Sequence, residues 1–302
     1  MIGFIRMVAR RRARQPAGSG RPRRWWMLEG LAGLGSVAAA QWLLKESTVS
    51  VWLVAALMVG GGVVLADAMI PVAARVFPAE RCEALGNLVG GALAIVGTVY
   101  AIVVGFVVVV VWQSVSDAET TVARESNAIA GLERMSRGYA VPVRRQVQEA
   151  ARTYLRLVID EEWDAMAERR SSARADAALV ELWNVYTDLA PADRTTPLYA
   201  ESLSRLNEIS DNRRLRLQAT GNRIPPLMWL LVYLGAVVTM VLAYAFGVQH
   251  GWYTRMVIWI LSGMLAFAVF LVAALDAPFD DRMSVEPAAF VFVQDNMAEL
   301  ER

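Results

Sequence analysis

The sequence has few of the residues that carry most enzyme and metal chemistry. Cys82 is the only cysteine and His250 the only histidine, which excludes an internal disulfide, a cysteine-based metal site and a pair of histidine ligands. The Walker phosphate-binding pattern is missing, and the spacing Gly30-x-x-Gly33-x-Gly35 follows no strand signal. No nucleophile with a neighbouring base is visible. We therefore expect neither an enzyme nor a bound organic cofactor.

An excess of charge of one sign is also missing. The chain has 30 Lys and Arg against 29 Asp and Glu, a net charge of +1. Nucleic-acid-binding proteins usually carry a basic excess, so we expect no nucleic-acid partner. Hydrophobic residues make up 56% of the chain. Many of them gather in runs of the roughly 20 residues that cross a hydrocarbon core about 30 Å thick. The lipid bilayer is therefore an expected partner.

Four such runs predict an all-α integral membrane protein with four transmembrane helices. The predicted spans are residues 49–73, 86–113, 227–247 and 254–275. They form two hairpins, residues 49–113 and 225–275. Between the hairpins, residues 114–224 repeat apolar positions at spacings of three and four, which is typical of helices with one buried face. We predict that this insert is a helical domain in the cytoplasm.

The N-terminal region sets the expected topology. Residues 1–27 carry eight arginines and no acid, and we predict a disordered basic arm that either contacts anionic lipids or only fixes orientation. Residues 28–48 are predicted to form an interfacial or half-inserted helix. The arginine excess then places both termini, the insert and the tail at 276–302 in the cytoplasm, in a multi-pass inner-membrane protein. If residues 28–44 crossed the membrane, the insert would lie outside.

The chain is organised around residues 86–137, which contain no proline. The first part is uncharged, and residues 86–113 reach roughly 42 Å as a helix. Past Trp112 the same helix becomes charged but keeps an apolar stripe, until Gly138 and Pro142 end it. A helix that continues from the membrane into a water-soluble domain is a rigid mechanical link between the two.

Two faces of the second span differ in residue size. Small residues fall on one face: Gly90, Ala94, Gly97, Ala101 and Gly105. Small residues let helix backbones approach closely in lipid, so this small face is predicted to be a helix-packing seam. Bulky residues fall on another face, which includes Val99, Ile102, Phe106 and Val110. This bulky face either contacts lipid or lines a space shared by the subunits of an oligomer.

Several acidic residues are candidates for special roles. Asp67, near the end of the first span, is expected at the membrane interface beside Pro71. The acid run at 160–164 is expected to be a solvated helix surface, because adjacent helical residues point in different directions. Three tail acids, Asp276, Asp280 and Asp281, either help to bind a hard cation such as Ca²⁺, which takes six to eight oxygens, or form a solvated turn.

The order of these segments resembles that of the bestrophin-like proteins, bacterial relatives of the bestrophin anion channels. The resemblance covers roughly residues 49–295: two spans, a helical insert, two spans and an acidic tail. Local runs support it, namely YAIVVGFVVVVVW, ARESNAIAGLERMSRG, SRLNEISDNRRLRLQATGNRIPPLMW and LDAPFDD.

The resemblance implies a homo-oligomeric anion channel, a pentamer, whose second span lines the pore. It also implies that the apolar row Val99, Ile102, Phe106 and Val110 forms the pore neck, and that the tail acids form a calcium clasp. The expected partners are then inorganic anions and further copies of the chain. The alternative function is a non-conducting membrane scaffold or signalling protein whose insert binds a partner.

Overall fold

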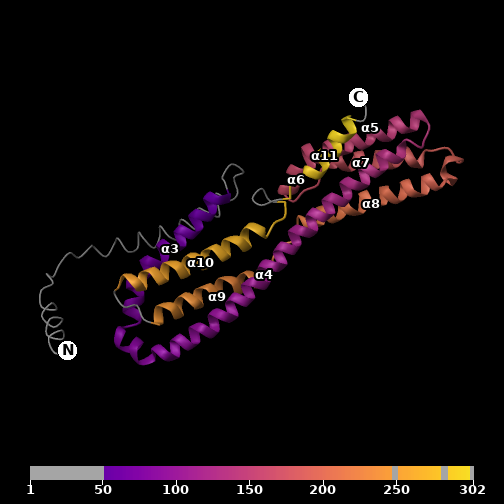
Figure 1. Ribbon diagram of the computed structural model, residues 1–302. Helices are drawn as coiled ribbons and strands as arrows, with labels where there is room; N and C mark the ends of the chain where they lie inside the picture. The colour runs from indigo at the N-terminus through magenta and orange to yellow at the C-terminus, as the bar shows by residue number, and fades with distance from the viewer. Residues whose placement is uncertain (1–50, 247–250, 280–284, 300–302) are drawn as a thin grey trace, which may run out of the picture.

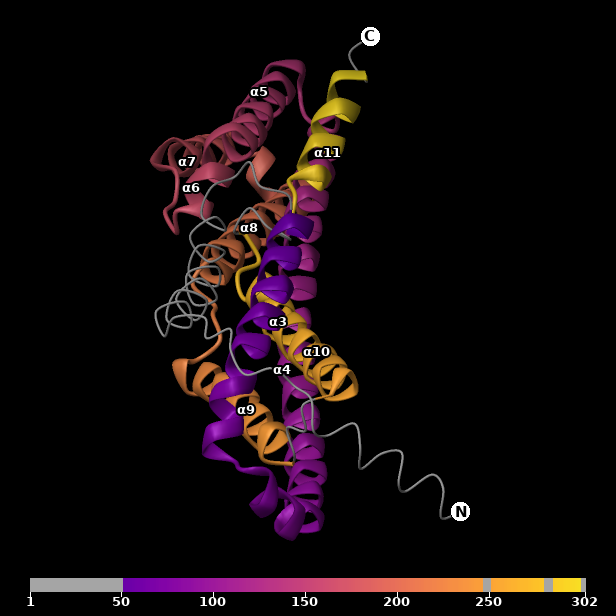
Figure 2. The same ribbon diagram turned by 90° about the vertical axis from the view of Figure 1, so that its left-hand side faces the viewer.

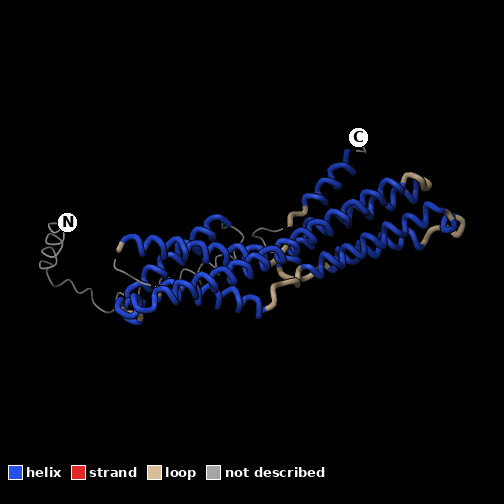
Figure 3. The backbone as a smooth tube through the Cα atoms, turned by 60° about the horizontal axis from the view of Figure 1, so that its bottom comes forward, coloured by secondary structure: helices blue, strands red, loops and turns tan. Residues whose placement is uncertain are grey.

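The computed structural model describes residues 51–246, 251–279 and 285–299, and all regular structure in these ranges is helical (Figure 3). The predicted arm at 1–27 and the predicted helix at 28–48 lie outside the described residues. Four helices are long and apolar enough to cross a membrane. They are α3 (Val51–Val76), α4 (Ala79–Ser136), α9 (Pro226–Ala245) and α10 (Trp252–Leu275). The prediction of an all-α membrane protein with four spans is confirmed.

Helix α4 is the longest helix among the described residues. Its 58 residues extend over roughly 87 Å at about 1.5 Å per residue. One part of α4 lies beside α9 and α10, and the other lies beside the helices of the insert (Figure 1). A single helix therefore connects the membrane bundle to the insert without a break.

Small residues bring the membrane helices close together. A Cβ atom added to Gly62 of α3 would lie 2.9 Å from the Cβ of Ala266 on α10. On α9, Gly235 faces the ring of Tyr100 on α4, whose hydroxyl donates to the Val232 carbonyl at 3.1 Å. Close backbone approach provides the van der Waals contact that holds helices together in lipid.

The insert is built from helices that pack around the second half of α4. They are α5 (Val141–Leu157), the π-helical turn η2 (Val158–Glu162), α6 (Trp163–Ala167), α7 (Ala173–Thr187) and α8 (Pro197–Ala219). The Ser172 hydroxyl caps α7 and the Thr196 hydroxyl caps α8, each accepting a hydrogen bond from a backbone N–H of the first turn. The inward-facing residues are buried, including Val147, Ala151, Tyr154, Val158 and Met166.

The C-terminal tail packs back onto the insert. Helix α11 (Ala288–Glu299) runs beside the last turns of α4 (Figure 2). The indole N–H of Trp163 donates to the Val285 carbonyl at 3.2 Å. The same indole makes edge contacts with Phe279 and Phe290, at centroid distances of 5.7 and 5.9 Å. These contacts attach the tail to the insert.

Candidate functional site

The membrane half of α4 has three faces rather than two. One face is buried against the other helices of the chain and consists of Tyr100, Val104, Val107, Val111 and Val115. This valine-rich face is the intrachain packing surface, and sequence reasoning missed it. Valine is as apolar as the neighbouring residues, so hydropathy alone could not separate a face packed on protein from one that meets lipid.

The bulky face of α4 points away from the other described helices. The four predicted pore-lining residues are exposed: Val99 by 57%, Ile102 by 54%, Phe106 by 68% and Val110 by 56%. They stand at spacings of three and four, so their side chains form one row along the helix. The structure therefore leaves this row free to meet lipid or another subunit.

The small face of α4 has almost no partner among the residues that the structure describes. Cβ atoms added to Gly97 and Gly105 would find nothing within 4 Å among the described residues, and Ala94 and Ala101 are exposed. Gly90 alone is covered, by the ring of Phe246. The predicted seam is thus largely unfilled by the described ranges of this chain, and close packing along it stays a prediction about contact with another copy.

A buried ion cluster joins four helical elements of the insert. Arg216 of α8 donates to both carboxylate oxygens of Glu125 on α4, at 2.8 and 3.0 Å, and to Glu162 of η2 at 2.9 Å. Arg213 donates to both oxygens of Glu162, at 3.2 and 2.6 Å, and to Asp176 of α7 at 2.7 Å. Bidentate pairs of this kind fix geometry as well as charge.

The expectation that the acid run at 160–164 forms a solvated surface is wrong for Glu162, which is fully buried. The π-helical turn Val158–Glu162 adds a residue to the turn, which changes the face that the following residues present. Arg213 and Arg216 of α8 are buried as well. The partner carboxylates lie far away in sequence, so no local pattern could have revealed the pairs.

The environment of the cluster raises the pKa of Tyr154 and of both arginines. Burial raises the pKa of Tyr154, whose hydroxyl donates to Glu125 at 2.6 Å, and the Glu125 charge raises it further. For Arg216, burial lowers the pKa, but the charge and hydrogen bonds of Glu125 outweigh this and the pKa is raised overall. The pKa of Arg213 is also raised: burial opposes the charged form, and the hydrogen bonds that Arg213 donates to Glu162 outweigh it. Both guanidinium groups of the cluster therefore stay charged.

Asp67 connects two membrane helices. Its carboxylate accepts hydrogen bonds from the Trp259 indole at 2.9 Å and from the Arg255 guanidinium at 3.3 Å, both on α10. Nearby, the Tyr244 hydroxyl of α9 donates to the Ala66 carbonyl at 2.8 Å. The acid predicted at the end of the first span thus has a role in helix pairing at this end of the bundle.

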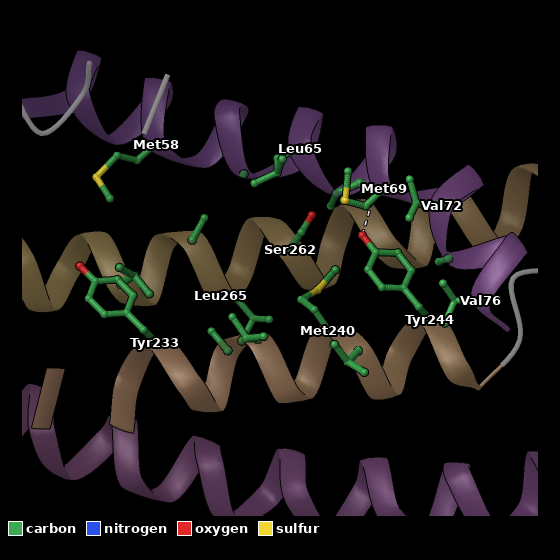
Figure 4. A pocket seen from close by; sticks show the side chains of 18 of the residues that line it. Met58, Leu65, Met69, Val72, Val76, Tyr233, Met240, Tyr244, Ser262 and Leu265 are labelled. Carbon is green, nitrogen blue, oxygen red and sulfur yellow. Dashed lines mark hydrogen bonds between the residues drawn. The ribbon is translucent and has the colours of Figure 1, made fainter. Parts of the chain in front are cut away.

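An apolar groove lies between α3, α9 and α10, with a volume of about 930 Å³ (Figure 4). Met58 and Met69 project from α3, Met240 from α9 and Leu265 from α10, and no charged side chain is among the lining residues. The Tyr244 hydroxyl closes one part of the groove by its bond to α3. Such a lining suits an apolar hydrocarbon group and offers no charged side chain that would bind an ion.

The tail acids are only partly described. Asp276, at the end of α10, accepts hydrogen bonds from the Ile224 backbone N–H at 2.6 Å and from the Trp229 indole at 3.4 Å. It therefore fastens the linker between α8 and α9. Asp280 and Asp281 lie outside the described residues, and the described part of the chain contains no group of three metal-binding side chains. A calcium site here stays a prediction.

Comparisons with known proteins agree with this architecture. A bestrophin-like domain model matches residues 61–290. Two point variants of a bestrophin homologue from Klebsiella pneumoniae share the fold, with 16% and 15% identity and TM-scores of 0.60. Each similarity covers 80% of this chain, and 98% and 99% of the homologue. A third solved structure, described as a membrane protein, is 15% identical with a TM-score of 0.61 and covers 80% and 98% of the two chains. The sequences of curated proteins give no significant match.

The residues that the family model matches are the ones that build the fold. The matched residues 61–290 include most of α3, all of α4 and the insert, both later spans and the start of α11. This is the order of spans, insert and tail on which the sequence resemblance rested, so the resemblance is confirmed. The chain belongs to the bestrophin-like family.

Proposed function

We propose that this protein is an oligomeric ion channel that conducts inorganic anions along an axis lined by α4. The observation that carries the proposal is the row Val99, Ile102, Phe106 and Val110, which is exposed along a helix whose opposite side is firmly packed. Rings of such residues around a shared axis form an apolar constriction, which can gate by dewetting. Membership of the bestrophin-like family supports the same assignment.

The unfilled small face supports assembly. Gly97 and Gly105 leave room beside α4 that no described residue of the same chain occupies. A neighbouring helix can approach closely there, while the bulky row turns toward the axis. We propose that the protein is a homo-oligomer, a pentamer by family likeness, in the inner membrane. In this proposal the insert and both termini lie in the cytoplasm.

The alternative function is a non-conducting scaffold or signalling protein. One feature favours it: a cavity of about 440 Å³ between α4 and α11, lined by both polar and apolar residues. Phe292, on its rim, is 67% exposed. An exposed aromatic side chain beside a cavity is a common feature of protein-binding surfaces.

Chloride flux in liposomes containing the purified protein separates the two functions. Phe106→Ala widens the proposed constriction and makes it less apolar, so flux should rise above that of the wild type. Phe267→Ala is the matched control, because Phe267 is an exposed aromatic residue that belongs to α10 and not to the row on α4. If the wild type and Phe106→Ala are both silent, the channel assignment fails and the scaffold takes its place.

A further inference from the structure

The bulky row of α4 does not stop at the membrane. At about 100° per residue, Gln113, Asp117, Thr120 and Arg124 lie within about 40° of the direction of Phe106. All four are exposed. The stripe is thus continuous along the helix: apolar as far as Val110 and polar from Gln113 to Arg124.

Two opposite charges stand on the polar part of this stripe. Asp117 lies about 16 Å beyond Phe106 along the helix axis, and Arg124 about 10 Å beyond Asp117. Neither side chain has an ion-pair partner among residues 51–246, 251–279 and 285–299. Glu125 on the same helix is, by contrast, paired with Arg216. Asp117 and Arg124 are therefore uncompensated within the described part of the chain.

We propose that Asp117 and Arg124 determine the charge selectivity of the conduction path. The inference rests on the proposed function, because only an axis lined by α4 brings copies of each residue together. In an oligomer, the side chains of Arg124 would form a positive ring toward the insert, and those of Asp117 a negative ring nearer the membrane. Rings of charged side chains select ions by sign.

The spacing of the two rings makes their effects separable. The Debye length at physiological ionic strength is about 8 Å, close to the separation of Asp117 and Arg124. An ion at one ring is therefore partly screened from the other. Arg124 raises the local concentration of anions, and Asp117 lowers it and favours cations. Anion selectivity then depends on Arg124, with Asp117 opposing it.

The test measures the reversal potential of purified protein in planar bilayers under a sodium chloride gradient. Asp117→Asn should raise the chloride-to-sodium permeability ratio, and Arg124→Gln should lower it, each on the order of fivefold. Both effects should grow as the salt concentration falls. Glu149→Gln is the matched control for Asp117, since Glu149 is exposed on α5 and belongs neither to the stripe nor to the small face of α4. Arg156→Gln, an exposed position on α5, is the control for Arg124.

A second measurement does not depend on conduction. In a Cys82→Ala background, Asp117→Cys should form oxidant-induced disulfides between copies, whereas Glu149→Cys on α5 should not. Permeability ratios that equal the wild-type value in both charge variants overturn this inference while leaving the channel in place. A wild-type protein without flux overturns the proposed function, and this inference with it. Cross-links at Glu149→Cys in place of Asp117→Cys would also overturn the inference.

Discussion

Arg216 on α8 and Glu125 on α4 are both fully buried and form a bidentate pair, with N–O distances of 2.8 and 3.0 Å. The same guanidinium lies over the rings of Trp163 and Phe290, at 5.6 and 5.5 Å from their centroids. Because Phe290 belongs to α11, one side chain contacts α4, the π-helical turn and the tail. Arg216 is therefore the point at which the insert, the tail and the long helix meet.

Arg216→Met should destabilise the protein strongly. The substitution leaves Glu125 and part of Glu162 buried without a counter-charge, and breaking a buried pair in this way costs about 3–5 kcal/mol. Thermal unfolding in detergent measures the effect. The control is Arg214→Met on the same helix, where the exposed pair with Asp211 is expected to contribute within about 0.5 kcal/mol. Equal stability of the two variants would contradict the central role of the cluster.

Two glycines should respond differently to the same substitution. Gly97→Leu adds a side chain where the described chain leaves open space, so the single-chain fold should persist while assembly is lost. Gly235→Leu adds one against the ring of Tyr100, so the fold itself should lose about 1–3 kcal/mol. Size-exclusion chromatography reports assembly, and thermal unfolding reports stability. Normal assembly of Gly97→Leu would show that the small face is not an interface between copies.

The proposed topology predicts which residues a membrane-impermeant thiol reagent can reach in intact cells. Cys82 lies in the first turn of α4, at the end opposite the insert, and should be labelled from outside. Ser171→Cys, placed in the exposed loop before α7 in a Cys82→Ala background, should be protected until the cells are opened. The reverse pattern would place the insert outside and imply that residues 28–44 also cross the membrane.

The tail acids should be tested by calcium addition and removal. If Asp276, Asp280 and Asp281 bind Ca²⁺, the melting temperature should rise with calcium concentration, because a ligand of the folded state stabilises it by mass action. Adding a chelator should reverse the rise, and Asp280→Ala with Asp281→Ala should abolish it. Asp276→Ala should lower stability even without calcium, since the Ile224 N–H loses its acceptor. If calcium does not change the melting temperature of the wild type, the acids have only this structural role.

The sequence by itself determined the class of the protein. Four apolar runs of bilayer length permit little besides four spanning helices, because backbone groups in lipid must be satisfied within the helix. The proline-free stretch 86–137 likewise specifies one long helix, since the groups that would end it come only at Gly138 and Pro142. Periodicity also predicted that each helix of the insert has one buried face, and Val147 and Tyr154 are among the residues buried there.

Only the tertiary structure decided which surfaces of these helices meet each other. The buried face of α4 is set by where α9 and α10 lie, and Val104 and Val107 look no different in sequence from Val99 and Val110. The pairing of Glu125 with Arg216 joins residues far apart in the chain. The π-helical turn, which supplies Glu162 as a second acceptor for Arg216, also follows from no local pattern. Periodicity fixes the direction of each side chain around its own helix, whereas contact depends on the relative placement of helices, which the long-range packing determines.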